Sequence, residues 1–195
     1  MRLVLASASP RRADLLAAAG FAFDTVPADV DERVLPGERP EDLVLRLALA
    51  KAINVAQGFP QRAVVAADTV VVVDDVILGK PENDEAAAAM LRRLSGRSHK
   101  VLTGLCVCHG SRVRQVLERS TVTFATLRDD EILSYVASGE PRDKAGAYAI
   151  QGLASRFVVA VDGSYSNVVG LPVATLYGLL RELGLAGGAT ADSGV

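Results

Sequence analysis

The stretch Lys100–Leu127, KVLTGLCVCHGSRVRQVLERSTVTFATL, decides the fold class of this chain. Two long runs rich in Val, Leu and Thr lie on either side of Gly110-Ser111, a pair typical of a tight turn. The pattern predicts an antiparallel hairpin, Lys100–His109 paired with Arg112–Leu127. Because strands and helices alternate elsewhere in the chain, a hairpin at its centre favours a mixed α/β fold over a doubly wound parallel sheet.

The segments outside the hairpin supply the other expected elements. Apolar runs predict strands at Arg2–Ala6, Phe21–Val26, Ala63–Val73, Val76–Leu78 and Phe157–Val161. Helical spacing, with caps, Pro or Gly at the ends, predicts helices at Pro10–Ala19, Pro40–Gln57, Asn83–Leu94, Asp129–Ala137 and Leu171–Leu183. Ser9 and Asp129 are the expected caps of their helices. The absence of a dividing linker predicts one domain over 1–186, with a second lobe at about 82–140 and a flexible tail over 187–195.

Composition and charge exclude several classes of protein. Of the 195 residues, 50% are hydrophobic and 23% are charged, which is typical of a globular chain. The net charge of −2 provides no general attraction to a nucleic acid polymer or a membrane. Cys106 and Cys108 share one face of a strand, which fits packing better than a redox pair or a zinc site. The N-terminal apolar run is too short for a signal peptide and no run reaches membrane-spanning length, so we expect a cytoplasmic protein.

The segment Ser7–Arg12, SASPRR, is the first that could carry chemistry. A strand ends here, and a helix begins with hydroxyls and two guanidiniums. A helix N-terminus offers free N–H groups and the positive end of its dipole, and Arg adds bidentate contacts to phosphate. A triphosphate is therefore a suitable ligand. Taken alone, however, the segment fits an ordinary capped helix with two solvated arginines better.

Asp68 and Thr69 lie in AADT, inside a strongly apolar strand. A carboxylate in such a place is costly unless it is paired, hydrogen-bonded or bound to a metal. Asp68 is therefore a candidate general base or magnesium ligand. The alternative is that the strand ends at Asp68, but the four valines after Thr69 argue against it.

Two lysines and an acidic pair could belong to the same site. Lys80, in Gly79-Lys80-Pro81, would supply a point charge for phosphate, although such turns are common and the P-loop spacing is absent. Lys51 lies at the edge of the buried stripe of its helix, so its side chain could reach into a cleft or extend to solvent. Asp31-Glu32 could face Lys51 or be an ordinary solvated pair.

Two glycine-rich segments near the C-terminus carry polar side chains, Tyr148–Gly152 (YAIQG) and Asp162–Pro172 (DGSYSNVVGLP). The amides of Gln151 and Asn167 both donate and accept hydrogen bonds, as recognition of a base or a phosphate requires. They could also serve only to form turns. His99 is an alternative base, but a single His after Gly-Arg-Ser is more often structural.

Taken in order, these segments resemble the Maf family, whose fold is similar to that of the inosine-triphosphatase-like pyrophosphatases. The matching stretches are SASPRR, VDE, LALAKA, AADTVV, GKP, SGRSHKVLTG, AGAYAIQG and GSYSNVVGLP, which span Ser7 to Pro172. The combination of SASPRR, AADT and GSYSNVVGLP is highly specific, and we find no departure at a position on which the family relies. The resemblance implies an elongated central sheet flanked by helices.

The resemblance also implies roles around a triphosphate. Asp68 matches the proton acceptor of the family. Arg12, Lys51 and Lys80 match the basic groups that contact the triphosphate. Glu32 matches an acidic residue of the cleft and is the expected partner of Asp68 in binding a divalent metal, Mg²⁺ or Mn²⁺.

The remaining positions bear on contacts and specificity. Ser7 or Ser9 matches the hydroxyl contacts of the family to substrate. Arg11, Thr69 and Gln151 match three positions that separate its subfamilies. This combination is similar to the branch that acts on dTTP and UTP, and differs from the branch that acts on 7-methyl-GTP.

The resemblance thus implies hydrolysis of dTTP and UTP to the monophosphate and pyrophosphate, with a small nucleoside triphosphate as the partner and the possibility of a homodimer left open. An alternative is a nucleotide-binding regulator of cell division without turnover, because the family is linked to arrest of septum formation. A Rossmann-type cofactor enzyme is set aside, because no GxGxxG follows the first strand.

Overall fold

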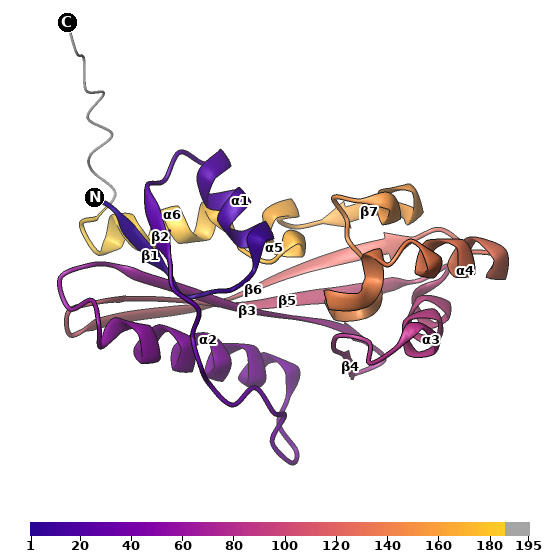
Figure 1. Cartoon of the computed structure of the whole chain (residues 1–195), viewed down its shortest axis with the longest axis horizontal. Coiled ribbons are helices and arrows are strands. Elements are labelled where there is room, and N and C mark those ends of the chain that lie inside the picture. Colours follow the sequence, from indigo (N-terminus) through magenta and orange to yellow (C-terminus); the bar gives the residue numbers. More distant parts are fainter. Residues whose placement is uncertain (186–195) are drawn as a thin grey trace, which may run out of the picture.

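One sheet runs through the computed structural model, which describes residues 1–185 (Figure 1). Its strand order is β2-β1-β3-β5-β6-β7, with β4 paired to β3 outside this path. The strands are β1 (Leu3–Leu5), β2 (Phe23–Thr25), β3 (Val64–Val73), β4 (Val76–Leu78), β5 (Ser98–His109), β6 (Arg112–Phe124) and β7 (Val158–Asp162). The helices are α1 (Pro10–Ala18), α2 (Pro40–Ala56), α3 (Asp84–Leu94), α4 (Asp129–Ala137), α5 (Tyr165–Val169) and α6 (Val173–Glu182), with short 3-10 helices η1 (Glu140–Asp143), η2 (Ala145–Ala147) and η3 (Leu153–Phe157).

Strands β5 and β6 form the predicted hairpin, paired from His109 and Arg112 at the turn to Ser98 and Thr123 at the far end. The turn residue Gly110 has a φ of 57°, which glycine adopts without strain. Strand β3 is antiparallel to β5, whereas β1 is parallel to both β2 and β3. The sheet therefore has a parallel part and an antiparallel part, which confirms the mixed α/β class.

Helices cover both faces of the sheet. In Figure 1, α2 lies on one face, whereas α1, α5 and α6 lie on the other. Gly104 of β5 permits a close approach of α2, because a Cβ added there would lie 2.1 Å from the carbonyl oxygen of Val44. Gly104 also pairs directly with Asp68 of β3. This contact holds α2 against the part of the sheet that carries Asp68.

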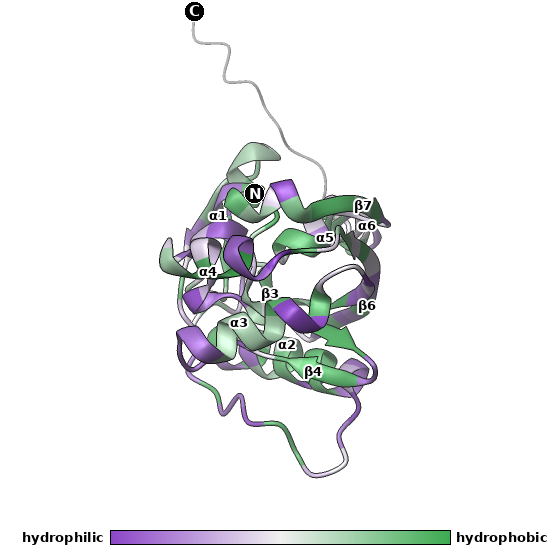
Figure 2. Cartoon of the chain, turned by 90° about the vertical axis from the view of Figure 1, so that its right-hand side faces the viewer, coloured by the Kyte–Doolittle hydropathy of each residue, from purple (hydrophilic) through white to green (hydrophobic). Residues whose placement is uncertain are grey.

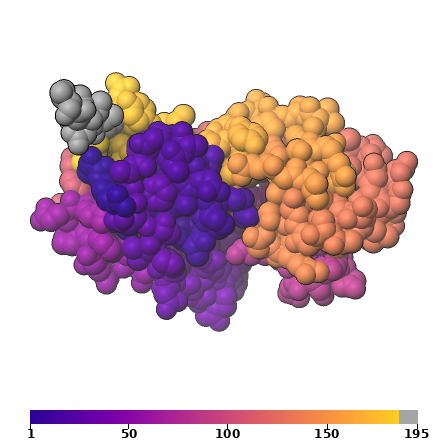
Figure 3. Space-filling model, turned by 45° about the horizontal axis from the view of Figure 1, so that its top comes forward, coloured from indigo at the N-terminus to yellow at the C-terminus, as the bar shows by residue number. Residues whose placement is uncertain are grey.

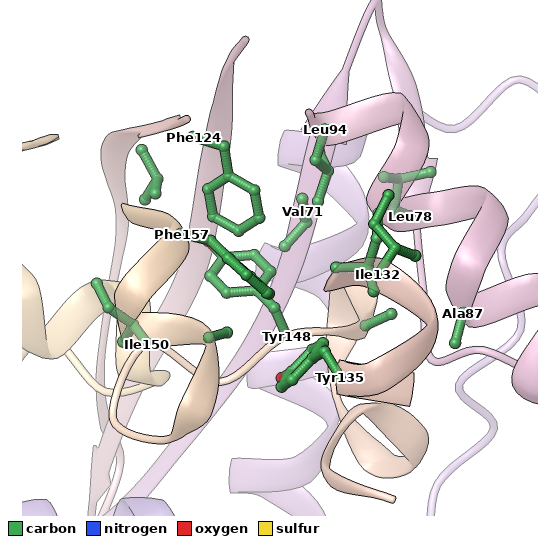
Figure 4. Close-up of a cluster of buried hydrophobic side chains, with 14 of the residues drawn as sticks. Val71, Leu78, Ala87, Leu94, Phe124, Ile132, Tyr135, Tyr148, Ile150 and Phe157 are labelled. Atoms are coloured by element: carbon green, nitrogen blue, oxygen red, sulfur yellow. The ribbon is translucent and has the colours of Figure 1, made fainter. Parts of the chain in front are cut away.

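The hydrophobic core divides along these layers. Leu5, Leu16 and Leu176 belong to the cluster between the sheet and the helices α1 and α6. Val4 and Ala52 belong to the cluster beneath α2. A larger cluster at the other end of the sheet joins α3, α4 and η3 and holds the buried rings of Phe124, Tyr135, Tyr148 and Phe157 (Figure 4). In Figure 2 the strands near the centre are largely hydrophobic, while the connection from β2 to α2 projects from the body and is largely hydrophilic.

Two local predictions require correction. The Asp162–Pro172 segment contains helix α5, which the glycine-rich sequence concealed; Ser164 caps it by accepting a hydrogen bond from Asn167 N at 3.2 Å. Asp129 is not the cap of α4. Arg128 occupies the cap position, and its N–H donates to Glu131 Oε2 at 2.8 Å, whereas Asp129 pairs with Arg92.

The division into two lobes stays a prediction, and the tail over 187–195 lies outside the described residues. Between residues 1 and 185, none of the helices combines the length and the apolar character needed to cross a membrane.

Candidate active site

A cleft of about 500 Å³ opens between the N-terminal segment and the segment around η1 and η2. Figure 3 shows a hollow where the indigo N-terminal residues face the orange ones. The cleft is lined by every residue that the sequence analysis assigned to the site: Ser7, Ser9, Arg11, Arg12, Glu32, Lys51, Asp68, Thr69, Lys80 and Gln151. Residues from six separate stretches of the chain are thus brought together in one place.

Lys51 and Asp68 form a buried ion pair inside the cleft. Lys51 Nζ donates to Asp68 Oδ1 at 2.6 Å, and the two residues are only 7% and 8% exposed. The second carboxylate on Lys51 Nζ is Glu32 Oε1, at 2.7 Å. Lys51 therefore reaches into the cleft, the first of the two alternatives that the sequence left open.

Glu32 approaches this pair from the connection between β2 and α2. Its side chain keeps 56% of its surface exposed. Partial burial alone would raise the pKa of Glu32, but the hydrogen bond and charge of Lys51, together with the charges of Lys80 and Arg12, lower it below the ordinary value. The carboxylate is thus held ionised by the surrounding cations.

Arg12 is fixed by three contacts at the start of α1. Its Nε donates to Gly170 O at 2.8 Å, and its two terminal nitrogens donate to Ser7 Oγ and Thr69 Oγ1, each at 3.3 Å. Burial lowers the pKa of Arg12, while the charges of Asp68 and Glu32 oppose that shift. The guanidinium is therefore ordered and held in the wall of the cleft rather than solvated.

The two serines lie where β1 ends and α1 begins. Ser7 is buried, and its Oγ accepts a hydrogen bond from Ser9 N at 3.1 Å. Ser9 occupies the predicted cap position of α1, but within the described chain its side chain makes no capping hydrogen bond. Ser9 and Pro10, the first residue of α1, both line the cleft.

Arg11, Lys80 and Gln151 lie nearer the mouth of the cleft. Arg11 Nη1 lies 3.4 Å from Asp143 Oδ2, so this pair connects α1 to η1 across the opening. Lys80 is exposed and forms no ion pair with any residue from 1 to 185. Gln151 is exposed on the turn between η2 and η3.

Asp143 and Lys144 also line the cleft, although neither was predicted from the sequence to do so. Lys144 Nζ lies 2.6 Å from Asp143 Oδ1 and donates to Glu140 O at 2.7 Å. The hydrogen bond from Lys144 lowers the pKa of Asp143, with a further contribution from Arg11. Their position could have indicated this role, because the two residues directly precede the AGAYAIQG segment, which also lines the cleft.

His99 lies behind the cleft and is not among the residues that line it. It is 2% exposed, and its Nε2 is 2.8 Å from the hydroxyl of Tyr148, a residue that does line the cleft. Burial lowers the pKa of His99 to about 4. This position, packed at right angles to the ring of Phe124, fits the structural alternative rather than a base that contacts substrate.

Comparison with known proteins identifies the family of this chain. A family model described as Maf-like protein matches residues 2–183. The chain belongs to this family. Among curated Maf-like relatives, a "dTTP/UTP pyrophosphatase" of Anaeromyxobacter dehalogenans is 54% identical over 187 residues, covering 94% of each chain. Another of the same name, from Geotalea uraniireducens, is 50% identical and covers 93% of this chain and 95% of the relative.

A solved structure extends the comparison to the fold. The Staphylococcus aureus Ham1 protein superposes on this Maf-like chain with a TM-score of 0.55 at 16% sequence identity, covering 94% of this chain and 100% of that one. At this identity the likeness bears on the fold alone.

The donor set of the Maf-like cleft fits a divalent cation only if a ligand completes the coordination. Glu32 and Asp68 each place a carboxylate oxygen within 2.7 Å of the same Lys51 nitrogen. Within residues 1–185, no cluster of three or more His, Cys, Asp or Glu side chains could hold a metal. Mg²⁺ is commonly bound by one or two carboxylates together with substrate phosphates. The residues present fit that arrangement, not a cation held by protein alone.

Proposed function

We propose that this Maf-like chain hydrolyses dTTP and UTP to the nucleoside monophosphate and pyrophosphate. The observation that carries the proposal is the meeting of a buried carboxylate, Asp68, with the cations Arg12, Lys51 and Lys80 in one cleft. The names of the relatives from Anaeromyxobacter dehalogenans and Geotalea uraniireducens support the choice of substrate.

The cations account for the position of cleavage. Phosphoryl transfer depends mainly on positioning and on neutralising the charge of the phosphate oxygens. Arg12, Lys51 and Lys80 would gather around the outer two phosphates, and the N-terminus of α1 adds N–H donors and a favourable dipole. Pyrophosphate then leaves as one unit, because its charge is spread over several donors.

Asp68 is proposed as the group that accepts a proton from the attacking water. The carboxylate has one oxygen on Lys51 Nζ, which fixes its orientation. When bound, Mg²⁺ or Mn²⁺ would neutralise phosphate charge and make the water more acidic, and Glu32 and Asp68 are the residues that would hold it. Arg12 lies close enough to influence both carboxylates without itself being a base.

Base recognition is assigned to Arg11, Thr69 and Gln151. The amide of Gln151 can both donate to and accept from a uracil or thymine edge, whereas Arg11 offers only donors. Thr69 is short, and its Oγ1 is already engaged by Arg12 and by Thr103 Oγ1 at 2.9 Å. We infer from the short side chain of Thr69 that a small pyrimidine fits beside Asp68.

Pyrophosphate release from dTTP with Mg²⁺ tests the proposal against the alternative, a nucleotide-binding regulator without turnover. If the chain is an enzyme, the wild type should release pyrophosphate steadily and the Asp68→Asn variant should not. A regulator would bind dTTP and release no pyrophosphate. A cytoplasmic location and a homodimer stay predictions.

A further inference from the structure

Outside the cleft, Tyr135 of α4, which belongs to the aromatic cluster, forms a polar pair with the half-buried Glu140 of η1 (Figure 4 labels Tyr135). The Tyr135 hydroxyl donates to Glu140 Oε1 at 2.8 Å. Tyr135 is completely buried, and its ring packs at right angles to that of Phe157 at 5.4 Å. Neither residue of the pair lines the cleft.

The pair binds the backbone on both sides of Gln151. Before Gln151, Ala149 N donates to the Tyr135 hydroxyl at 3.2 Å. After it, Leu153 N donates to Glu140 Oε2 at 3.0 Å and Ala154 N to Glu140 Oε1 at 3.4 Å. The turn that carries Gln151 is therefore tied to one buried tyrosine and one carboxylate.

Gly152 is required for this arrangement because the carboxylate of Glu140 occupies the position that a side chain at residue 152 would need. A Cβ added at Gly152 would lie 2.2 Å from Glu140 Oε2. Only a residue without a side chain lets the carboxylate come close enough to accept the N–H groups that follow. The carbonyl oxygen of Glu140 in turn accepts from Lys144 Nζ at 2.7 Å, so the same residue also holds a cation of the cleft wall.

We propose that Tyr135 and Glu140 are positioning residues that hold Gln151 toward the base and so set the preference for pyrimidine nucleotides. This inference rests on the proposed function, because it assigns the pair to the recognition step of that reaction. Neither side chain contacts substrate; both act through the backbone of the Gln151 turn.

Glu140→Gln isolates the role of the carboxylate. Oε1 of Glu140 accepts hydrogen bonds from two donors and Oε2 from one. A glutamine has only one side-chain oxygen, so in either orientation its N–H₂ group faces a backbone N–H of the loop and leaves that N–H without an acceptor. Tyr135→Phe keeps the ring and removes the hydroxyl that bridges Glu140 and Ala149. The matched control is Glu131→Gln, since Glu131 Oε2 also accepts a backbone N–H, from Arg128 at 2.8 Å, away from the cleft.

Two measurements on the purified full-length chain test the proposal. Amide hydrogen exchange, without nucleotide, should be faster at Ala149 in Tyr135→Phe and at Leu153 and Ala154 in Glu140→Gln than in wild type or Glu131→Gln. The ratio of kcat/KM for UTP to that for GTP should fall roughly 10-fold in both variants of the pair and stay unchanged in the control.

An unchanged ratio together with faster exchange would overturn the proposal, because the pair would then support the loop without setting specificity. Unchanged amide exchange in both variants would also overturn the proposal, because it would show that the pair does not hold the Gln151 turn. If the wild type shows no preference for UTP over GTP, the proposed function fails and the claim on base preference falls with it, while the exchange data still report separately on whether the pair holds the loop.

Discussion

Lys51 Nζ and Asp68 Oδ1 lie 2.6 Å apart between α2 and β3, and both side chains are almost fully removed from solvent. A buried ion pair of this kind costs desolvation of both charges, so it contributes little net stability compared with apolar residues. Removing only one partner is much more costly, because the other charge stays buried without compensation. Net stabilisation therefore does not account for the presence of this pair in the cleft.

Lys51→Met should lower the free energy of unfolding by about 3 kcal/mol, because it leaves Asp68 buried without its cation. The double variant Lys51→Met with Asp68→Asn should recover part of that loss, since neither charge is then left alone. Urea denaturation at neutral pH of Lys51→Met, Asp68→Asn and the double variant measures these changes. Lys100→Met, at an exposed position of β5, is the control and should change stability little. Simple additivity of the two single changes would contradict the pairing.

Asp68→Asn should lower turnover on UTP by about 100-fold or more while leaving KM within a modest factor, because a general base acts mainly in the transition state. Steady-state kinetics on matched preparations measures both parameters. Asp75→Asn, in the exposed turn between β3 and β4, should keep wild-type kinetics. Near-normal turnover in Asp68→Asn would remove it as the base, and Glu32 would become the next candidate.

Gln151→Glu should strongly reduce kcat/KM for UTP and dTTP, because it replaces an amide donor with a negative charge. The melting temperature should change little, because Gln151 lies on an exposed turn. Kinetics with a pyrimidine and a purine triphosphate, together with a melting curve, separates the two effects. Gln57→Glu, exposed at the end of α2, adds the same charge away from the cleft. A base preference equal to that of wild type would show that Gln151 does not read the base.

His99 should make the protein sensitive to acid. Its folded-state pKa of about 4 lies below the ordinary 6.5, so the unfolded chain binds the extra proton first and stability falls as the pH drops from 6.5 to 4. The full difference corresponds to about 3 kcal/mol. Urea denaturation across this range should show a steeper decline in wild type than in His99→Gln. His109→Gln, at the hairpin turn, should decline as wild type does.

The hairpin and the buried strand around Asp68 were predictable because their signals are local. Apolar runs around Gly110-Ser111 predict paired strands whatever surrounds them, and a carboxylate within a run of valines indicates a site. Helix α5 was missed because it has five residues and is flanked by glycines, which suggest loop. Residue propensities do not reliably predict so short a helix, because it is stabilised mainly by tertiary packing.

The orientation of Lys51 depends on a contact that no local pattern contains. Helical periodicity placed Lys51 at the edge of a buried stripe, where extension of the side chain to solvent is the more common outcome. The close approach of α2 to Gly104, itself paired with Asp68, decides the matter by tertiary packing. The link between Glu140 and the Gln151 turn is hidden for the same reason, because it joins segments whose contact arises only in the folded chain.

Hydrolysis of dTTP and UTP to the monophosphate and intact pyrophosphate can be tested by one competition experiment with product analysis. The wild-type chain is incubated with Mg²⁺ and an equal mixture of UTP, dTTP, CTP, ATP and GTP, and the nucleotides and phosphates are separated by chromatography over time. We predict that UTP and dTTP disappear first and that their monophosphates accumulate in step with intact pyrophosphate. Prior consumption of GTP, or the appearance of diphosphates with orthophosphate, would contradict it.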